Sequence, residues 1–254
     1  TESAALFGAS PYMTAFEMAV QKRDGGIDTV AGERPVWGSR LQEAIAQGIA
    51  DDYGVSIESM GLVYAVDDES RMGSSFDYQI VGAENLHPDL SGTQLIDTFQ
   101  RLGPGLMEVK NVDSLEYKRK WIDDEAPQHI EIQLQHQLEV LGLPWGCIAA
   151  LIGGNRVGLL IRERDTKVGA IIRKKIKAFW ADYDTGKLPD PLMPDDAAVL
   201  IALYQYADPN KVYDGQSDAV LEGLAQSYRA AAEAEKAAAE QKKVAKAHML
   251  EIIK

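Results

Sequence analysis

Asp77, Glu108 and Lys110 lie in two short, partly apolar segments whose residue types and spacing suit phosphodiester chemistry. Because side chains alternate between the faces of a strand, Glu108 and Lys110 share one face, and we expect Leu106 and Val109 to point the other way. A neighbouring strand that carries Asp77 would bring a second carboxylate close to Glu108. Adjacent carboxylates repel each other unless a cation joins them, and hard oxygen ligands suit Mg²⁺. The pattern therefore predicts a metal-dependent site that cleaves phosphodiesters.

The Glu-x-Lys sequence alone is weak evidence, since such a pair on a strand is usually part of a solvated face. A polar stripe in a later apolar segment, residues 133–138 (Gln-Leu-Gln-His-Gln-Leu), strengthens it. Buried amides need hydrogen-bond partners. Gln133 and Gln137 are one helical turn apart, so both can face one groove, while Gln135 and His136 point to other sides.

These motifs together resemble a known family. Asp77, residues 108–110, residues 133–136 and the turn Ser10-Pro11-Tyr12-Met13-Thr14 are similar to the motifs of YqaJ-type viral recombinases, the lambda-exonuclease-type family of the PD-(D/E)xK nuclease superfamily. The resemblance covers residues 1 to 182. It implies an α/β fold, a restriction-endonuclease-like core in which helices flank a mixed central sheet. It also implies an Mg²⁺-dependent exonuclease that degrades linear duplex DNA from 5′ to 3′ and leaves a 3′ single strand.

The resemblance implies a role for each residue of the site. Asp77, Glu108 and the Val109 carbonyl would hold one or two Mg²⁺ ions, for which Mn²⁺ would substitute. Lys110 would position the attacking water and offset charge that develops on phosphorus. Gln133 would brace the nucleophile or a nearby metal ligand.

A helix ahead of the strands supplies a further metal candidate. Related enzymes carry a glutamate that faces the metal where this sequence has Gln42. The amide oxygen of Gln42 still suits coordination of the metal or of a water. Glu43 points about 100° further round the helix and is the weaker candidate. An ordinary solvated pair remains the alternative for both residues.

DNA contacts are also expected from the resemblance. The family carries a Ser or Thr at the position of Thr1 and an arginine ahead of it, and both contact the terminal phosphate. The arginine is not in this sequence, which leaves a preference for 5′-phosphorylated ends open. The basic residues around 173–177 suit a DNA path or a subunit contact, with a solvated face as the alternative. The expected DNA-binding residues are Thr1, Ser10, Tyr12, Gln135, His136, Lys174 and Lys175.

The composition of the chain limits the possible size of the core, the location of the protein and the DNA path. The chain has 254 residues, 46% of them apolar, enough for one substantial core with an appendage. No apolar run reaches the roughly 20 residues of a membrane span. Cys147 is the one cysteine, which excludes an internal disulfide and fits a reducing bacterial cytoplasm, the expected location of a phage or prophage protein. The net charge of −13 repels phosphate at long range, so a DNA path must be a local basic channel.

Apolar periodicity and turn signals predict the elements that position the site. We expect a nuclease core over residues 1–190 and a helical extension over 191–254, with a long Ala/Glu/Lys-rich helix from about 216. Within the core, residues 67–70 form an acidic turn between two long strands. The predicted strands are 55–66, 71–82, 145–152 and 157–161, and the predicted core helices are 15–22, 41–53, 91–102, one containing 133–138, and 166–183.

Three other functions remain open at this stage. An endonuclease or single-strand nuclease would keep the same metal site. A nuclease-fold module with a disabled site would bind DNA without cutting it, which is permitted by Gln42 and by Ile130, a position where many relatives have tyrosine. An interaction protein would act through the C-terminal helix. For the exonuclease, the resemblance implies duplex DNA ends as substrate, a single-strand annealing protein as partner and a trimeric ring.

Overall fold

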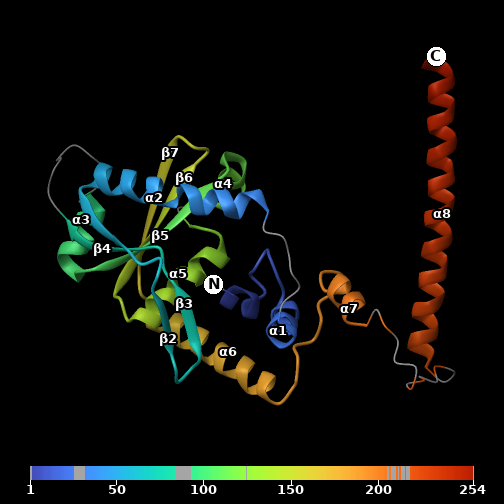
Figure 1. Cartoon of the computed structure of the whole chain (residues 1–254), viewed down its shortest axis with the longest axis horizontal. Coiled ribbons are helices and arrows are strands. Elements are labelled where there is room, and N and C mark those ends of the chain that lie inside the picture. Colours follow the sequence, from blue (N-terminus) through green and yellow to red (C-terminus); the bar gives the residue numbers. More distant parts are fainter. Residues whose placement is uncertain are drawn as a thin grey trace. The chain divides into compact units, whose positions relative to one another are not determined.

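The computed structural model describes residues 2–25, 32–83, 93–123, 125–204, 206, 210, 212, 215 and 218–253. The chain divides into two compact units, residues 1–200 and 201–254. The first unit contains a central sheet covered by helices, and the second contains one long helix (Figure 1). The domain boundary that we expect at residue 190 stays a prediction.

A five-stranded mixed sheet forms the centre of the first unit, in the order β1-β4-β5-β6-β7. Its neighbouring strands are antiparallel except for β5 and β6, which are parallel. A parallel pair requires a crossover connection, and the helix α5 (Gln128–Leu141) lies in that connection. The mixed sheet flanked by helices confirms the predicted fold class. The strands are β1 (Val55–Ser59), β4 (Tyr78–Ala83), β5 (Gly105–Val112), β6 (Trp145–Ile152) and β7 (Arg156–Glu163).

Helices cover both faces of this sheet. On one face, α2 (Glu33–Tyr53) and α3 (Thr93–Leu102) pack against Met107 and Val109 of β5. On the other face, α5 packs against Leu106. Leu106 therefore shares its face with Glu108 and Lys110, and the expectation that it points with Val109 is wrong, because residues 106, 108 and 110 follow the two-residue period of a strand.

The two long strands that we expect at residues 55–66 and 71–82 are each interrupted. A turn at residues 60–63 separates β1 from β2 (Tyr64–Asp67), and residues 76–77 separate β3 (Met72–Ser75) from β4. β2 and β3 form a separate two-stranded sheet. The interruption has a packing cause, since the Phe76 side chain is buried in the core beneath α5.

The other predicted elements are present with small changes in length. Thr14 caps α1 (Ala15–Asp24) by accepting a hydrogen bond from the Glu17 N–H at 3.0 Å, as its position predicts. β6 and β7 form the expected hairpin. None of the described helices is long and apolar enough to cross a membrane. The remaining helices are η1 (Glu2–Phe7), α4 (Ser114–Lys120), α6 (Thr166–Asp184), α7 (Ala197–Leu203) and α8 (Ala219–Ile253).

Candidate active site

Asp77 and Glu108 meet where the β4–β5 ladder ends. The last pair of that ladder is Tyr78 with Met107, so Asp77 precedes the first residue of β4 and Glu108 follows its partner. The chain bends at Asp77, and its Oδ2 accepts a hydrogen bond from the Val109 N–H at 2.8 Å. A side-chain acceptor thus replaces the backbone acceptor that a longer β4 would supply. The resulting geometry fixes the Asp77 carboxylate beside β5.

Burial and a neighbouring negative charge both act on Asp77. Burial is the larger cause and the charge of Glu108 is the smaller one, and together they raise the pKa of Asp77 to about 6. The Val109 N–H, the Lys110 ammonium and a hydrogen bond from the Gln42 side chain each oppose this rise. These three groups therefore do not offset the combined effect of burial and of the Glu108 charge on Asp77.

Glu108 is only 3% exposed and is held by three polar side chains. Its Oε1 accepts hydrogen bonds from Lys110 Nζ at 2.6 Å and from Gln133 Nε2 at 2.5 Å. Its Oε2 accepts a hydrogen bond from Gln137 Nε2 at 2.8 Å. Lys110 Nζ also donates to Gln133 Oε1 at 3.1 Å, which closes a ring of contacts among Glu108, Lys110 and Gln133.

Gln137 belongs to this site, although we do not assign it there from the sequence. Its Nε2 donates both to Glu108 and to the Ser75 carbonyl at 3.1 Å, so one amide joins β5 to the end of β3. Its Oε1 is buried and makes no hydrogen bond. The sequence signal was the spacing of Gln133 and Gln137, which places both amides on the same side of α5.

The donor set at this point fits a hard divalent cation. The carboxylate of Glu108 is close enough to Asp77 for its charge to raise the pKa of Asp77, and a divalent cation such as Mg²⁺ would relieve this repulsion. The N–H and C=O of one strand residue point to the same side, so the Val109 carbonyl lies on the Asp77 side, beyond the end of β4. Gln42 from α2 supplies an amide at the same place. Among the described residues, no group of three His, Cys, Asp or Glu is suited to a metal.

Several predicted site residues lie elsewhere. Glu43 is exposed on α2, next to the inward-facing Gln42. Gln135 is occupied by backbone groups, because its Nε2 donates to the Glu163 carbonyl and its Oε1 accepts from the Asp165 N–H, each at 2.9 Å. It therefore braces the connection from β7 to α6 and does not face the carboxylates. Thr1 lies outside the described residues.

The predicted turn near the start of the chain lies beside an open groove. Ser10 Oγ accepts hydrogen bonds from the backbone N–H groups of Tyr12 and Met13 at 3.2 and 3.3 Å, so this hydroxyl stabilises the turn. Tyr12 is exposed, and its ring meets that of His129 edge-on at 5.8 Å. The groove, about 830 Å³ in volume, runs past Lys110. Its lining includes Tyr12, Arg34, Trp37, Lys110, Lys120, Trp121 and His129.

The basic residues of α6 contact residues other than the carboxylate pair and the groove. Arg173 forms ion pairs with Asp67 of the acidic turn and with Glu139 of α5, the latter at 2.8 Å. Arg173 is therefore half-buried and paired, unlike the exposed basic residue that we expect there, whereas Lys174, Lys175 and Lys177 are exposed. Lys175 Nζ donates to the Leu6 carbonyl at 2.9 Å, and Lys174 is exposed. The structure does not bring Lys174 or Lys175 to the carboxylate pair.

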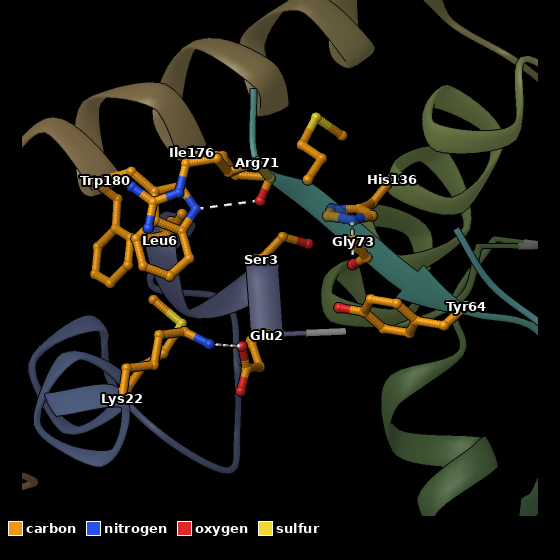
Figure 2. Close-up of a pocket in the computed structure, with 13 residues that line it drawn as sticks. Glu2, Ser3, Leu6, Lys22, Tyr64, Arg71, Gly73, His136, Ile176 and Trp180 are labelled. Atoms are coloured by element: carbon orange, nitrogen blue, oxygen red, sulfur yellow. Dashed lines mark hydrogen bonds and ion pairs between the residues drawn. The ribbon is translucent and has the colours of Figure 1, made fainter. Parts of the chain in front are cut away.

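His136 lines a second cavity, of about 100 Å³, between η1, α1, β3, α5 and α6 (Figure 2). Its Nε2 contacts the Gly73 carbonyl at 3.2 Å, and its Nδ1 is buried with no partner. Burial lowers the pKa of the His136 imidazole to about 4, so the ring is neutral at physiological pH. Across the cavity, Lys22 pairs with Glu2 at 2.5 Å. His136 thus stabilises β3 and is separate from the carboxylate pair.

A mixed sheet with an acidic pair at the end of one ladder and Glu-x-Lys on the next strand defines the PD-(D/E)xK class of nuclease folds. Comparisons with known proteins agree with this class. The chain belongs to the YqaJ-like viral recombinase domain family, whose model matches residues 1–144. Protein YqaJ of Bacillus subtilis (strain 168) is 24% identical over 219 residues, a match that covers 84% of this chain and 62% of that relative. The chain therefore spans less than two thirds of that relative's length.

Two solved structures share the fold. The alkaline exonuclease LHK-Exo from Laribacter hongkongensis matches with a TM-score of 0.51 and 16% identity, over 81% of this chain and 92% of the exonuclease. LHK-Exo in complex with dAMP matches with a TM-score of 0.54 and 15% identity, over 73% of this chain and 86% of that chain. At these identities the matches show the fold alone.

Proposed function

We propose that this protein is an Mg²⁺-dependent exonuclease that degrades linear duplex DNA from 5′ to 3′ and leaves 3′ single strands for recombination. Family membership and the fold shared with an alkaline exonuclease support a nuclease. The observation that carries the proposal is the pair of neighbouring carboxylates, Asp77 and Glu108. Glu108 is hydrogen-bonded to Gln133 and to Lys110, and Lys110 lines an open groove.

The residues that would hold the ion are Asp77, Glu108 and the Val109 carbonyl, with Gln42 as a further oxygen donor and Mn²⁺ as a substitute ion. When bound, the ion would supply Lewis acidity to the scissile phosphate. The raised pKa of Asp77 supports this assignment, because a cation would relieve the repulsion between the two carboxylates. Below about pH 6 the Asp77 carboxyl group takes up a proton and competes with the ion for the same oxygens.

Lys110 is the candidate for stabilising charge that develops on the phosphate. Its ammonium lies at the edge of the groove, where a phosphate can approach, and it is held in place by Glu108 and Gln133. Gln133 keeps the lysine and the carboxylate in one fixed geometry, since its amide donates to Glu108 and accepts from Lys110. The groove places exposed aromatic and basic side chains beside this point, which suits the bases and backbone of a DNA strand.

The finer parts of the proposal follow the family. They comprise a substrate of duplex ends, a trimeric ring that encloses DNA, transfer of the 3′ strand to a single-strand annealing protein, and action in the cytoplasm of a bacterial host. The net charge of −13 is compatible with an enclosing ring, because an acidic exterior would repel DNA outside the channel.

Linear duplex DNA labelled separately at its 5′ and 3′ ends tests the proposal. The protein is incubated with this DNA and Mg²⁺, beside Lys110→Ala, an EDTA control, and the matched control Lys167→Ala, which alters an exposed lysine at the start of α6. We expect early loss of the 5′ label, abolished by Lys110→Ala and by EDTA and unchanged in Lys167→Ala. Early loss of the 3′ label would contradict the polarity, and cleavage of circular DNA would favour an endonuclease.

A second candidate function is a DNA-binding module that does not cut. One observation favours it: Gln42 donates a hydrogen bond to Asp77 at the position where related enzymes carry a metal-facing glutamate. In that case the protein would bind DNA with normal affinity and leave it intact with Mg²⁺ or Mn²⁺. Gln42→Glu separates the two candidates, because a third carboxylate would restore cleavage in a disabled site. An active wild-type enzyme excludes this function.

A further inference from the structure

The helix α8 exposes large apolar side chains at both of its ends. None of its 35 residues is buried. The central part, from residue 229 to 243, carries only alanine, glutamine and charged residues. The exposed apolar residues near the first end are Val220, Leu221, Leu224 and Tyr228, and those near the second end are Val244, Met249, Leu250, Ile252 and Ile253.

Most of these residues fall on one side of the helix. At about 100° per residue, Leu221, Leu224 and Tyr228 form a stripe that passes through Ala232 and Ala239 and reaches Leu250 and Ile253. We call this stripe the α8 seam; it consists of Leu221, Leu224, Tyr228, Ala231, Ala232, Glu235, Ala239, Lys242, Lys246, Met249, Leu250 and Ile253. Val244 lies on the opposite side. The seam therefore has apolar ends and a centre of small and charged residues.

The two halves of α8 carry opposite charge. Residues 219–235 contain three glutamates and one arginine, a net charge of −2. Residues 236–253 contain four lysines and two glutamates, a net charge of +2 with neutral histidine. Two copies of α8 laid side by side in parallel would place each half against a half of the same charge. Two antiparallel copies would place each acidic half against a basic half.

We propose that α8 is a self-association element that pairs with α8 of a second copy of this chain in antiparallel orientation. Apolar contacts do not distinguish the two orientations, because an apolar end meets an apolar end in both of them. Charge does distinguish them. In a parallel pair, Lys242 and Lys246 of one copy would repel the same lysines of the other copy. In the antiparallel pair they lie near the acidic half of the other copy. Antiparallel packing also opposes the two helix dipoles.

One register pairs the apolar ends of the two seams. Setting Leu224 opposite Leu250 of the second copy also sets Leu221 opposite Ile253, and by symmetry the same contacts form at the other end. In the same register Tyr228 meets Lys246, whose alkyl chain can lie along the ring. In the same register Ala232 lies opposite Lys242 and Ala239 opposite Glu235, so each long charged side chain of the centre faces a small one that leaves room for it.

Antiparallel pairing has a consequence for the assembly. Such a pair is related by a twofold axis, and the three-fold symmetry of a ring contains no such axis. The α8 pair would therefore join two copies of whatever assembly the nuclease core forms by itself. Loss of the pairing halves the number of subunits, whether the core alone is a monomer or a trimer.

Light scattering on the full chain tests this prediction. We expect the double variant Leu224→Gln with Leu250→Gln to have half the molar mass of the wild type at the same concentration. The matched control Val244→Gln removes an apolar side chain from the opposite side of α8 and should keep the wild-type mass. Lys242→Glu with Lys246→Glu should also halve the mass, because it makes the second half of α8 acidic. Equal masses for the wild type and the seam variants would overturn the proposal and leave the seam for a different protein.

Cysteine cross-linking tests the orientation. Cys147 is buried in β6, so single cysteines added to α8 would be the accessible thiols. Leu224→Cys and Leu250→Cys proteins, mixed and oxidised, should form a disulfide-linked pair. Neither protein should cross-link alone, because antiparallel copies of one such position lie about 39 Å apart at 1.5 Å per residue. Cross-linking of Leu224→Cys with itself would indicate a parallel pair and overturn the proposal.

Discussion

Replacing Asp77 by asparagine should make the metal-free protein more stable at alkaline pH while it abolishes the proposed activity. The Asp77 carboxyl group is buried beside Glu108, and its pKa in the folded chain is about 6 against an ordinary value of 3.8. Because the folded-state pKa is raised, the protonated group favours folding below pH 3.8, and this contribution is lost as pH rises through about 6. Asparagine resembles the protonated form and carries no charge at any pH.

The size of the effect follows from the pKa difference. The shift from 3.8 to about 6 is close to two pKa units, each equivalent to 1.36 kcal/mol. At pH 8 in EDTA we expect Asp77→Asn to raise the free energy of unfolding by up to about 3 kcal/mol. The gain should shrink as pH falls and be nearly absent at pH 4. The Oδ1 of the asparagine in this variant can still accept the hydrogen bond from the Val109 N–H.

Urea unfolding of both proteins at several pH values measures this gain directly. The difference between variant and wild type reports the interacting pair of Asp77 and Glu108, because the titrating groups elsewhere in the chain are shared. Added Mg²⁺ should stabilise the wild type and leave Asp77→Asn nearly unchanged, since a ligand that binds only the folded state adds to stability. An Asp77→Asn protein that is less stable than wild type at pH 8, or a gain that does not vary with pH, would refute this account of the site.

Four further predictions concern the first unit. Gln137→Leu should lower the free energy of unfolding by about 2 kcal/mol, because a buried carboxylate loses a donor. The His136 ring should titrate near pH 4 by NMR, so its contribution to stability is complete above pH 6.5 and is lost as pH falls toward 4. Gly105→Ala should destabilise by about 2 kcal/mol, because its Cβ would lie 2.3 Å from the Trp145 ring. Gly48→Ala, with nothing within 4 Å, should stabilise α2 by up to about 1 kcal/mol.

Each of these has its own control or contrary result. Gln47→Leu, on the exposed side of α2, should change stability by less than about 0.5 kcal/mol. A loss of similar size in Gln47→Leu would mean that the Gln137 effect is not due to its buried contacts. A His136 ring that is protonated at pH 6 would contradict its burial. Equal stability of Gly105→Ala and wild type would contradict the close packing of Trp145 on β5.

Local signals made part of this fold predictable. Thr14 ahead of an apolar run marks the start of α1, and a glycine in the left-handed conformation, Gly25, marks its end. The four-residue spacing of Gln133 and Gln137 places both amides on one side of α5, where they meet Glu108. These features depend on residues close together in the sequence, which is why the pattern alone indicates them.

Features set by distant residues were not predictable in this way. The interruption at residues 76–77 depends on the burial of Phe76 under α5, and an alternating pattern cannot distinguish one long strand from two. Two partners of Arg173, Asp67 and Ser70, lie about a hundred positions away in the acidic turn at 67–70, so its charge alone suggests an exposed surface. Asp77 could be assigned to the site from its motif, but its hydrogen bond to Val109 depends on where β4 begins.

The position of the carboxylate pair does not depend on the length of the connection between β4 and β5. Asp77 and Glu108 are brought together by the pairing of Tyr78 with Met107, at the end of the ladder farthest from that connection, and α3 lies within the intervening chain. Evolution can therefore lengthen or shorten this segment without moving either acid. A motif search with a fixed gap between the two acids would overlook such relatives, whereas one with a variable gap would recover them.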